Sequence, residues 1–212
     1  MTGVSTRRAA TRERLVEAAV TVFAEKGVGG ASVEEICEVA GFTRGAFYSN
    51  FEHKDALCEA VLETLHADTL LAMNEALAAA DALTDATLDT LIPSVIGVFI
   101  ESQRADRTWA LAGQELRLYA AREPALAVVY RRFHHRATTV FGQVMVDALR
   151  RHGFELTAAP ADAIGVLHAV HDYGTIGALI GSDSIEGDVK LRMLVEVLRA
   201  FIRPLPEASA PH

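Results

Sequence analysis

The sequence predicts an all-α protein of about nine helices, with a small N-terminal helix-turn-helix domain and a larger C-terminal helical domain. Three observations support this prediction. Apolar residues recur every three or four positions along most of the 212-residue chain, which is the helical period. Before residue 57, glycines and helix-capping residues interrupt that period at short intervals, which indicates short helices there. No alternating strand pattern competes with the helical one.

Composition indicates an ordinary globular chain that needs no cofactor to fold. Half of the residues are hydrophobic and 23% are charged, so a full core can be buried. The two cysteines, Cys37 and Cys58, are too few for a disulfide framework, and we therefore expect a reducing, cytoplasmic environment. The longest apolar tract, residues 163–180, contains two histidines and an aspartate, which makes it a poor membrane span.

The distribution of charge matters more than its total. A net charge of −8 argues against a general nucleic-acid binder, which needs clustered cations to neutralise phosphates. Residues 1–57, however, carry seven basic and eight acidic side chains, whereas the remainder carries 13 and 20. Four arginines and one glutamate occupy the first 14 residues. We therefore expect residues 1–10 to form a flexible basic arm.

The first three helices are predicted from their boundaries. Apolar spacing predicts a helix over 11–26, which Gly27 ends. Ser32 and Glu35 have the spacing of a capping box and begin a second short helix that ends before Gly41. Thr43 is a suitable N-cap for a third helix over 44–50. Two short helices joined by a glycine turn, with another helix beneath, make a helix-turn-helix.

The later helices follow from longer periodic stretches. One begins near His53 or Lys54 and runs to about Ala80. The others are predicted over 87–102, with a kink at Pro93, and over 106–122, 124–151, 161–181 and 187–202. The tail over 204–212, with three prolines and two alanines, is predicted to be disordered.

The start of the third helix has the residues of a DNA reader. Arg44 can donate a bidentate pair of hydrogen bonds to guanine or to a phosphate, and Gly45 lets the backbone approach closely. The run from Gly41 to Leu57, GFTRGAFYSNFEHKDAL, resembles the signature of the tetracycline-repressor-type (TetR) family. The resemblance extends upstream through Phe23, Gly27, the Ser32 cap and Ile36 and covers about a quarter of the chain. Cys37 departs slightly, since the family usually has alanine there.

The resemblance implies a division into a DNA-binding domain over 11–57, with its motif at about 31–50, and a sensing and dimerisation domain over 58–203. It also implies DNA-facing roles for six residues: Ser32, Thr43, Arg44, Gly45, Tyr48 and Lys54. Arg7 or Arg8 could extend from the arm toward a minor groove. Each role has a structural alternative, because Ser32 and Thr43 are N-caps in any case and Lys54 could be a solvated residue at a helix start.

The family's remaining helices imply a pocket for a small molecule and a homodimer through the last two helices. The sequence supplies apolar and aromatic candidates for the pocket, most of which could equally be core: Phe99, Trp109, Leu116, Tyr119, Tyr130, Phe141, Met145 and His171. Three glycines at 174, 177 and 181, with the apolar stripe of Leu191, Leu194, Val195, Leu198 and Ile202, are assigned to the dimer interface.

The resulting hypothesis is a transcriptional regulator, a repressor in the family's usual mode, that leaves a palindromic operator when it binds a small hydrophobic ligand. An activator of transcription would use the same helix-turn-helix, so activation remains an alternative to repression. Rival interpretations are a helical enzyme using Glu115 or His171, and an interaction module that has lost DNA binding. His168 and His171 could face one metal, but no third ligand is identifiable. We therefore expect no catalysis, metal or cofactor.

Overall fold

The computed structural model describes residues 2–83, 87–102, 106–181 and 187–206. These residues form nine helices and two short strands, in the order α1 (Thr2–Gly30), α2 (Val33–Ala40), α3 (Arg44–Tyr48), α4 (Lys54–Asp81), α5 (Leu88–Ser102), α6 (Arg107–Arg122), α7 (Pro124–Arg151), β1 (Phe154–Leu156), α8 (Pro160–Leu179), α9 (Gly187–Ala200) and β2 (Ile202–Pro204). The all-α prediction is confirmed. Within this part of the chain no helix combines the length and apolar character needed to cross a bilayer.

Packing divides the chain into two compact units. The first comprises Met1–Asp68 and Arg104–His134, and the second comprises Thr69–Gln103 and His135–His212. The division falls within α4 and within α7, so each of these helices contributes one part to each unit.

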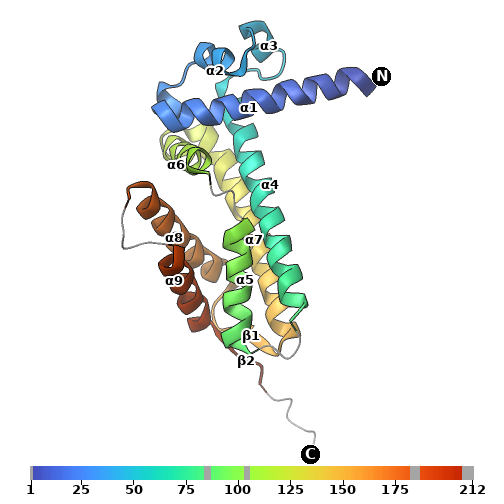
Figure 1. Cartoon of the computed structure of the whole chain (residues 1–212), viewed down its shortest axis with the longest axis vertical. Helices are drawn as coiled ribbons and strands as arrows, with labels where there is room; N and C mark the ends of the chain where they lie inside the picture. The colour runs from blue at the N-terminus through green and yellow to red at the C-terminus, as the bar shows by residue number, and fades with distance from the viewer. Residues whose placement is uncertain (1, 84–86, 103–105, 182–186, 207–212) are drawn as a thin grey trace, which may run out of the picture. The chain divides into compact units, whose positions relative to one another are not determined.

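The first unit is built around α1, which has α2 and α3 on one side and α6 on the other (Figure 1). The spacing of Leu15, Ala19 and Phe23 puts all three side chains in the core, where they are fully buried. Leu57 from α4 and Leu116 from α6 complete the same cluster. This core supports α2 and α3 and leaves their outer faces in solvent.

The ends of α1 differ from the sequence prediction. The helix begins at Thr2, where we expected a flexible arm over 1–10. Arg8 helps to hold this first part, because its guanidinium donates to the Ser49 carbonyl at 3.1 Å. At the other end Gly27 interrupts the helix as predicted, with φ of 70°, but a last helical stretch continues to Gly30.

The second unit has its own apolar core, in which α9 packs against both α5 and α8. Ile92 and Ile96 from α5 meet Leu149 from α7 and Leu194 and Leu198 from α9. Each contributing helix brings its apolar side chains at helical spacing, which explains why the sequence pattern located these helices.

The second unit also contains a short two-stranded sheet, which no alternating pattern in the sequence indicated. β1 and β2 are antiparallel, with Phe154 opposite Pro204 and Leu156 opposite Ile202. The Leu205 N–H also donates to the Gly153 carbonyl at 2.8 Å, so the predicted disordered tail is paired at its start. Three residues per strand are too few to produce a period-two pattern. Residues 207–212 of that tail lie outside the described residues.

Candidate functional site

The first half of the helix-turn-helix is fixed by a capping box at the start of α2. The Glu35 N–H donates to Ser32 Oγ at 3.2 Å, and the Ser32 N–H donates to Glu35 Oε2 at 3.0 Å. The Lys26 ammonium pairs with the same carboxylate. Hydrogen bonding from Lys26, followed by that from Ser32, lowers the pKa of Glu35 to about 2. The predicted capping box is confirmed, and it uses the hydroxyl that we also assigned to DNA.

The turn between α2 and α3 depends on Gly41, which adopts a left-handed conformation with φ of 69°. Its N–H donates to the Glu38 carbonyl at 3.1 Å, and the Phe42 N–H donates to the Cys37 carbonyl at 2.9 Å. Arg14 adds a cationic cap, donating to the Ala40 carbonyl at 2.8 Å. The end of α2 is therefore closed on itself, which directs the chain sharply into α3.

α3 presents four of the six predicted DNA-facing residues together. Thr43 caps the helix by accepting from the Ala46 N–H at 3.3 Å. Phe47 is fully buried and anchors the helix to the core, whereas Thr43, Arg44, Gly45 and Tyr48 are exposed. Half of the Tyr48 surface is accessible, although its ring meets Phe47 edge-on. A polar and aromatic face on a short, firmly anchored helix is what a major-groove reader requires.

An acidic residue that the sequence analysis did not select lies beside this face. Arg44 Nη1 pairs with Glu34 Oε1 at 2.7 Å, and its guanidinium carbon lies 5.9 Å from the centre of the Tyr48 ring. Hydrogen bonding to Tyr48 and then the charge of Glu34 raise the pKa of Arg44. The sequence signals only that Glu34 is acidic in a first helical turn, so its contact with Arg44 was not predictable.

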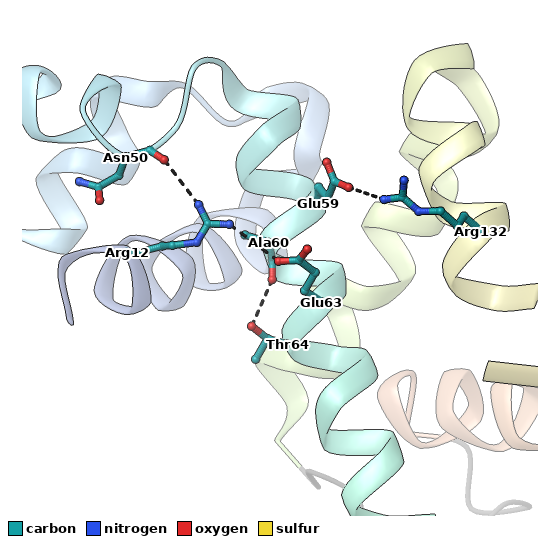
Figure 2. A network of polar contacts seen from close by, with 7 residues as sticks. All are labelled: Arg12, Asn50, Glu59, Ala60, Glu63, Thr64 and Arg132. Carbon is teal, nitrogen blue, oxygen red and sulfur yellow. Dashed lines mark hydrogen bonds and ion pairs between the residues drawn. The ribbon is translucent and has the colours of Figure 1, made fainter. Parts of the chain in front are cut away.

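Two α1 arginines hold the far end of α3. Arg8 Nη2 donates to the Ser49 carbonyl at 3.1 Å, and Arg12 Nη1 donates to the Asn50 carbonyl at 3.5 Å. Arg12 also lies 3.8 Å from Glu63 of α4, and Figure 2 shows it between these two partners. The figure also shows Arg132 of α7 paired with Glu59 of α4, at 2.6 Å. Arg8 and Arg12, near the N-terminus, thus stabilise the C-terminal end of α3.

Lys54 occupies a structural position in this unit. Its ammonium donates to the carbonyls of Val28 at 2.8 Å and Ala31 at 3.1 Å, where α1 ends. It also lies 5.6 Å from the centre of the Tyr119 ring, on α6. Two of the three N–H donors of Lys54 thus already have partners. The phosphate contact that the resemblance implies for Lys54 stays a prediction.

The second unit contains a cavity of about 120 Å³. Its wall is almost wholly apolar and is formed by five helices, with Met73, Ile92, Phe141, Ile164 and Leu198 among its residues. Among the described residues of the lining, only His168 and His171 have polar side chains.

The predicted pocket residues divide between the two units. Phe141, Met145 and His171 line this cavity. The others, Trp109, Leu116, Tyr119 and Tyr130, belong to the core of the first unit or pack against it, and they do not line the cavity. The side chain of Phe99 lies outside the described residues. Several aliphatic residues of the wall were not predicted, because nothing in their spacing separates a cavity wall from a core.

His171 is a titratable residue of the cavity lining whose pKa is strongly shifted. Burial lowers the pKa of this histidine to about 4, and the positive charge of Lys190 acts in the same direction. Asp172 opposes the shift and His168 adds slightly to it. The buried Nδ1 of His171 has no hydrogen-bond partner within the described part of the chain. No cluster of three or more metal-ligating side chains occurs among those same residues.

The apolar stripe of α9 does not face outward. Leu194, Val195 and Leu198 are buried in the core of the second unit, so their assignment to a dimer interface is corrected. Gly174 is likewise covered by the stem of Lys190 from the same chain. Among the described side chains of the last two helices and their ends, the large exposed apolar ones are Val166, Tyr173 and Ile176 of α8 and Ile180, its C-cap.

The helix-turn-helix can now be compared with known proteins. Residues 15–61 match the model of the bacterial regulatory proteins of the tetR family. Those residues belong to the TetR family. The HTH-type transcriptional regulator TtgR of Pseudomonas putida is 43% identical over 56 residues, a match that spans 26% of this chain and only 27% of that regulator. The match to this curated relative thus covers the helix-turn-helix region, and the chain spans about a quarter of that relative's length.

Solved structures extend the likeness to the whole fold. A TetR-family regulator from Rhodococcus sp. has a TM-score of 0.73 at 19% identity, covering 91% of this chain and 98% of its own. SmeT, a repressor of a Stenotrophomonas maltophilia efflux pump solved with triclosan, has a TM-score of 0.67 at 25% identity, covering 95% and 100%. The chain thus has the fold of TetR-type regulators, with a helix-turn-helix followed by a helical C-terminal part.

Proposed function

We propose that this chain is a DNA-binding transcriptional regulator. The observation that carries the proposal is the exposed face of α3, where Thr43, Arg44, Gly45 and Tyr48 stand together on a TetR-type helix-turn-helix. Arg44 would read guanine in the major groove, and Tyr48 would position the helix on a phosphate. Ser32 and Lys54 would add backbone contacts. Residues 11–57 would act as the DNA-binding domain and 58–203 as the sensing domain.

The regulator would act as a homodimer. A twofold axis would place two copies of α3 in successive major grooves, roughly 34–36 Å apart, on a palindromic operator. The outer face of α8 suits a second copy, because it exposes 61% of Tyr173 and 76% of Ile180 beside Val166 and Ile176. This surface replaces the α9 stripe as the proposed interface between the last helices.

Release from DNA would follow binding of a small hydrophobic molecule. The apolar cavity of the second unit supports this step, and the triclosan complex of SmeT shows that protein with such a ligand. Ligand would favour a conformation in which the two recognition helices no longer match the groove spacing. Coupling of this kind is typically worth about 1–3 kcal/mol, or roughly 5- to 150-fold in operator affinity.

The proposal is tested by selecting a binding site from a random DNA pool and measuring affinity by fluorescence anisotropy. Arg44→Ala and Tyr48→Phe should each weaken binding by about 5- to 150-fold, in line with roughly 1–3 kcal/mol for one lost contact. Arg131→Ala, which removes an exposed charge from α7, is the matched control and should leave affinity nearly unchanged. Selection of no sequence, or equal affinities for all four proteins, would contradict the proposal.

A further inference from the structure

The exposed face of α3 carries a negative charge directly beside its arginine. Arg44 is the one charged residue of α3, and its Nη1 lies 2.7 Å from Oε1 of Glu34, which belongs to the first turn of α2. Both side chains are accessible, to 61% for Arg44 and 55% for Glu34. The two opposite charges are therefore presented to solvent together, as one pair.

Helix capping does not account for this glutamate. α2 begins with two adjacent acidic residues, Glu34 and Glu35. Glu35 closes the capping box with Ser32 and pairs with Lys26, so the start of the helix already has its carboxylate. An exposed ion pair also adds little to stability. The contact between Glu34 and Arg44 therefore matters more for what Arg44 can bind than for the fold.

The ion pair limits where Arg44 can bind on DNA. A phosphate that engaged Arg44 would compete with Glu34 for the guanidinium and would bring its own negative charge close to the carboxylate, which is unfavourable. A guanine offers neutral acceptors instead, at O6 and N7. A guanidinium has five N–H donors, and the pair with Glu34 is made through Nη1, so donors remain for guanine. Glu34 therefore disfavours phosphate contacts of Arg44 more than a guanine contact.

A G·C base pair offers complementary groups at this spacing. In the major groove, cytosine presents its N4 amino group as a donor beside O6 of the guanine with which it pairs. Carboxylates accept from this amino group, as arginine donates to guanine. Glu34 and Arg44, whose charged groups touch, thus match a donor and acceptors that are adjacent on one base pair. An A·T pair presents O4 of thymine, an acceptor, where the carboxylate needs a donor.

We propose that Glu34 determines base specificity together with Arg44: Arg44 donates to O6 and N7 of a guanine, while the Glu34 carboxylate accepts a hydrogen bond from N4 of the paired cytosine. The inference rests on the proposed function, because it adds a second base-reading residue to the same DNA site. Glu34 is not among the six residues that the family resemblance implies. Its charge lowers the affinity for phosphate and raises the discrimination among base pairs.

Modified bases in the selected operator test the two contacts separately. 7-Deazaguanine lacks the N7 acceptor and locates the guanine, because it should weaken binding of the wild type but not of Arg44→Ala. N4-methylcytosine opposite that guanine keeps the base pair and replaces the outward N–H donor with a methyl group. It should weaken the wild type about fivefold, which is the value of one net hydrogen bond, and Glu34→Ala less than about twofold. Equal losses in both proteins, or no loss in the wild type, would overturn the proposal.

Two further variants separate the contact from the charge. Glu38→Ala is the matched control, because it removes the same charge from an exposed position one turn further along α2, and it should respond to N4-methylcytosine like the wild type. Glu34→Gln retains an acceptor oxygen and should keep part of the response. Circular dichroism spectra confirm that each variant is folded. A response of Glu38→Ala that matched that of Glu34→Ala would assign the effect to net charge and contradict the proposal.

The outcome of the selection separates this inference from the proposed function. A chain that selects no sequence from the random pool would contradict DNA reading itself. A selected operator that responds to N4-methylcytosine equally with and without Glu34 would contradict only the role of Glu34 and preserve the regulator. A selected operator in which no guanine depends on Arg44 would also contradict this inference while preserving DNA binding.

Discussion

Replacing Lys54 with methionine keeps a long, unbranched side chain and removes its charge. In the wild type the ammonium donates to the carbonyls of Val28 and Ala31, at 2.8 and 3.1 Å, where α1 ends. A hydrogen bond from a charged donor contributes about 1.5–3 kcal/mol when buried. Lys54 is only half-buried, so in the variant water can partly satisfy the two carbonyls. We therefore expect the free energy of unfolding to decrease by about 2 kcal/mol for both hydrogen bonds together. In a chain of this size that lowers Tm by roughly 4–8 °C.

Thermal and urea unfolding, followed by far-ultraviolet circular dichroism, measure this loss. Arg131→Met is the control, because it removes an exposed charge from α7 and should change Tm little. Unchanged stability of Lys54→Met, accompanied by weakened DNA binding, would refute the capping role. That result would instead support the phosphate contact implied by the family resemblance.

Three further predictions concern Glu34, His171 and Cys58. Glu34→Gln should free Arg44 from its ion pair and tighten operator binding by about two- to fivefold at low salt, as exposed ion pairs are weak; weaker binding in anisotropy would mean that Glu34 orients Arg44 productively. His171 has a pKa of about 4 in the folded chain and near 6.5 in the unfolded chain. The unfolded chain therefore binds a proton first as the pH falls from about 6.5 toward 4, and the free energy of unfolding should decrease by up to about 3 kcal/mol over this range. Urea titrations should show His171→Leu losing less stability than the wild type over this range, and parallel curves would count against the shift. Burial raises the pKa of Cys58 to about 12, so at pH 8 this thiol should resist the reagent DTNB until the chain unfolds; a rapid reaction of Cys58 in the native protein would disprove its burial.

Helical periodicity explains which parts of the fold were predictable. Leu15, Ala19 and Phe23 repeat at helical spacing and are buried together, and the capping residues Ser32 and Thr43 mark the starts of α2 and α3 as expected. The β1–β2 pair was missed because its register depends on contacts between residues 46 to 50 positions apart. The helical start of α1 was missed because Arg8 finds its partner, the Ser49 carbonyl, only in the folded chain.

The candidate sites were predictable to different degrees. The exposed face of α3 follows in part from local spacing, since Arg44 and Tyr48 are four residues apart and therefore lie near one another on the helix surface. The cavity could be predicted only in part, because Phe141 and Trp109 have the same chemistry and similar helical settings. Which of them borders empty space depends on how five helices meet, and that information is tertiary. The same reason explains why the α9 stripe was mistaken for an interface.

We infer that two copies of α3 bind one palindromic operator. Hydroxyl-radical footprinting of the selected site, across a salt series, tests this inference. Two protected half-sites are expected, roughly 34–36 Å apart, with protection that weakens steeply as salt rises. Protection of a single half-site, or no protection at low salt, would contradict it.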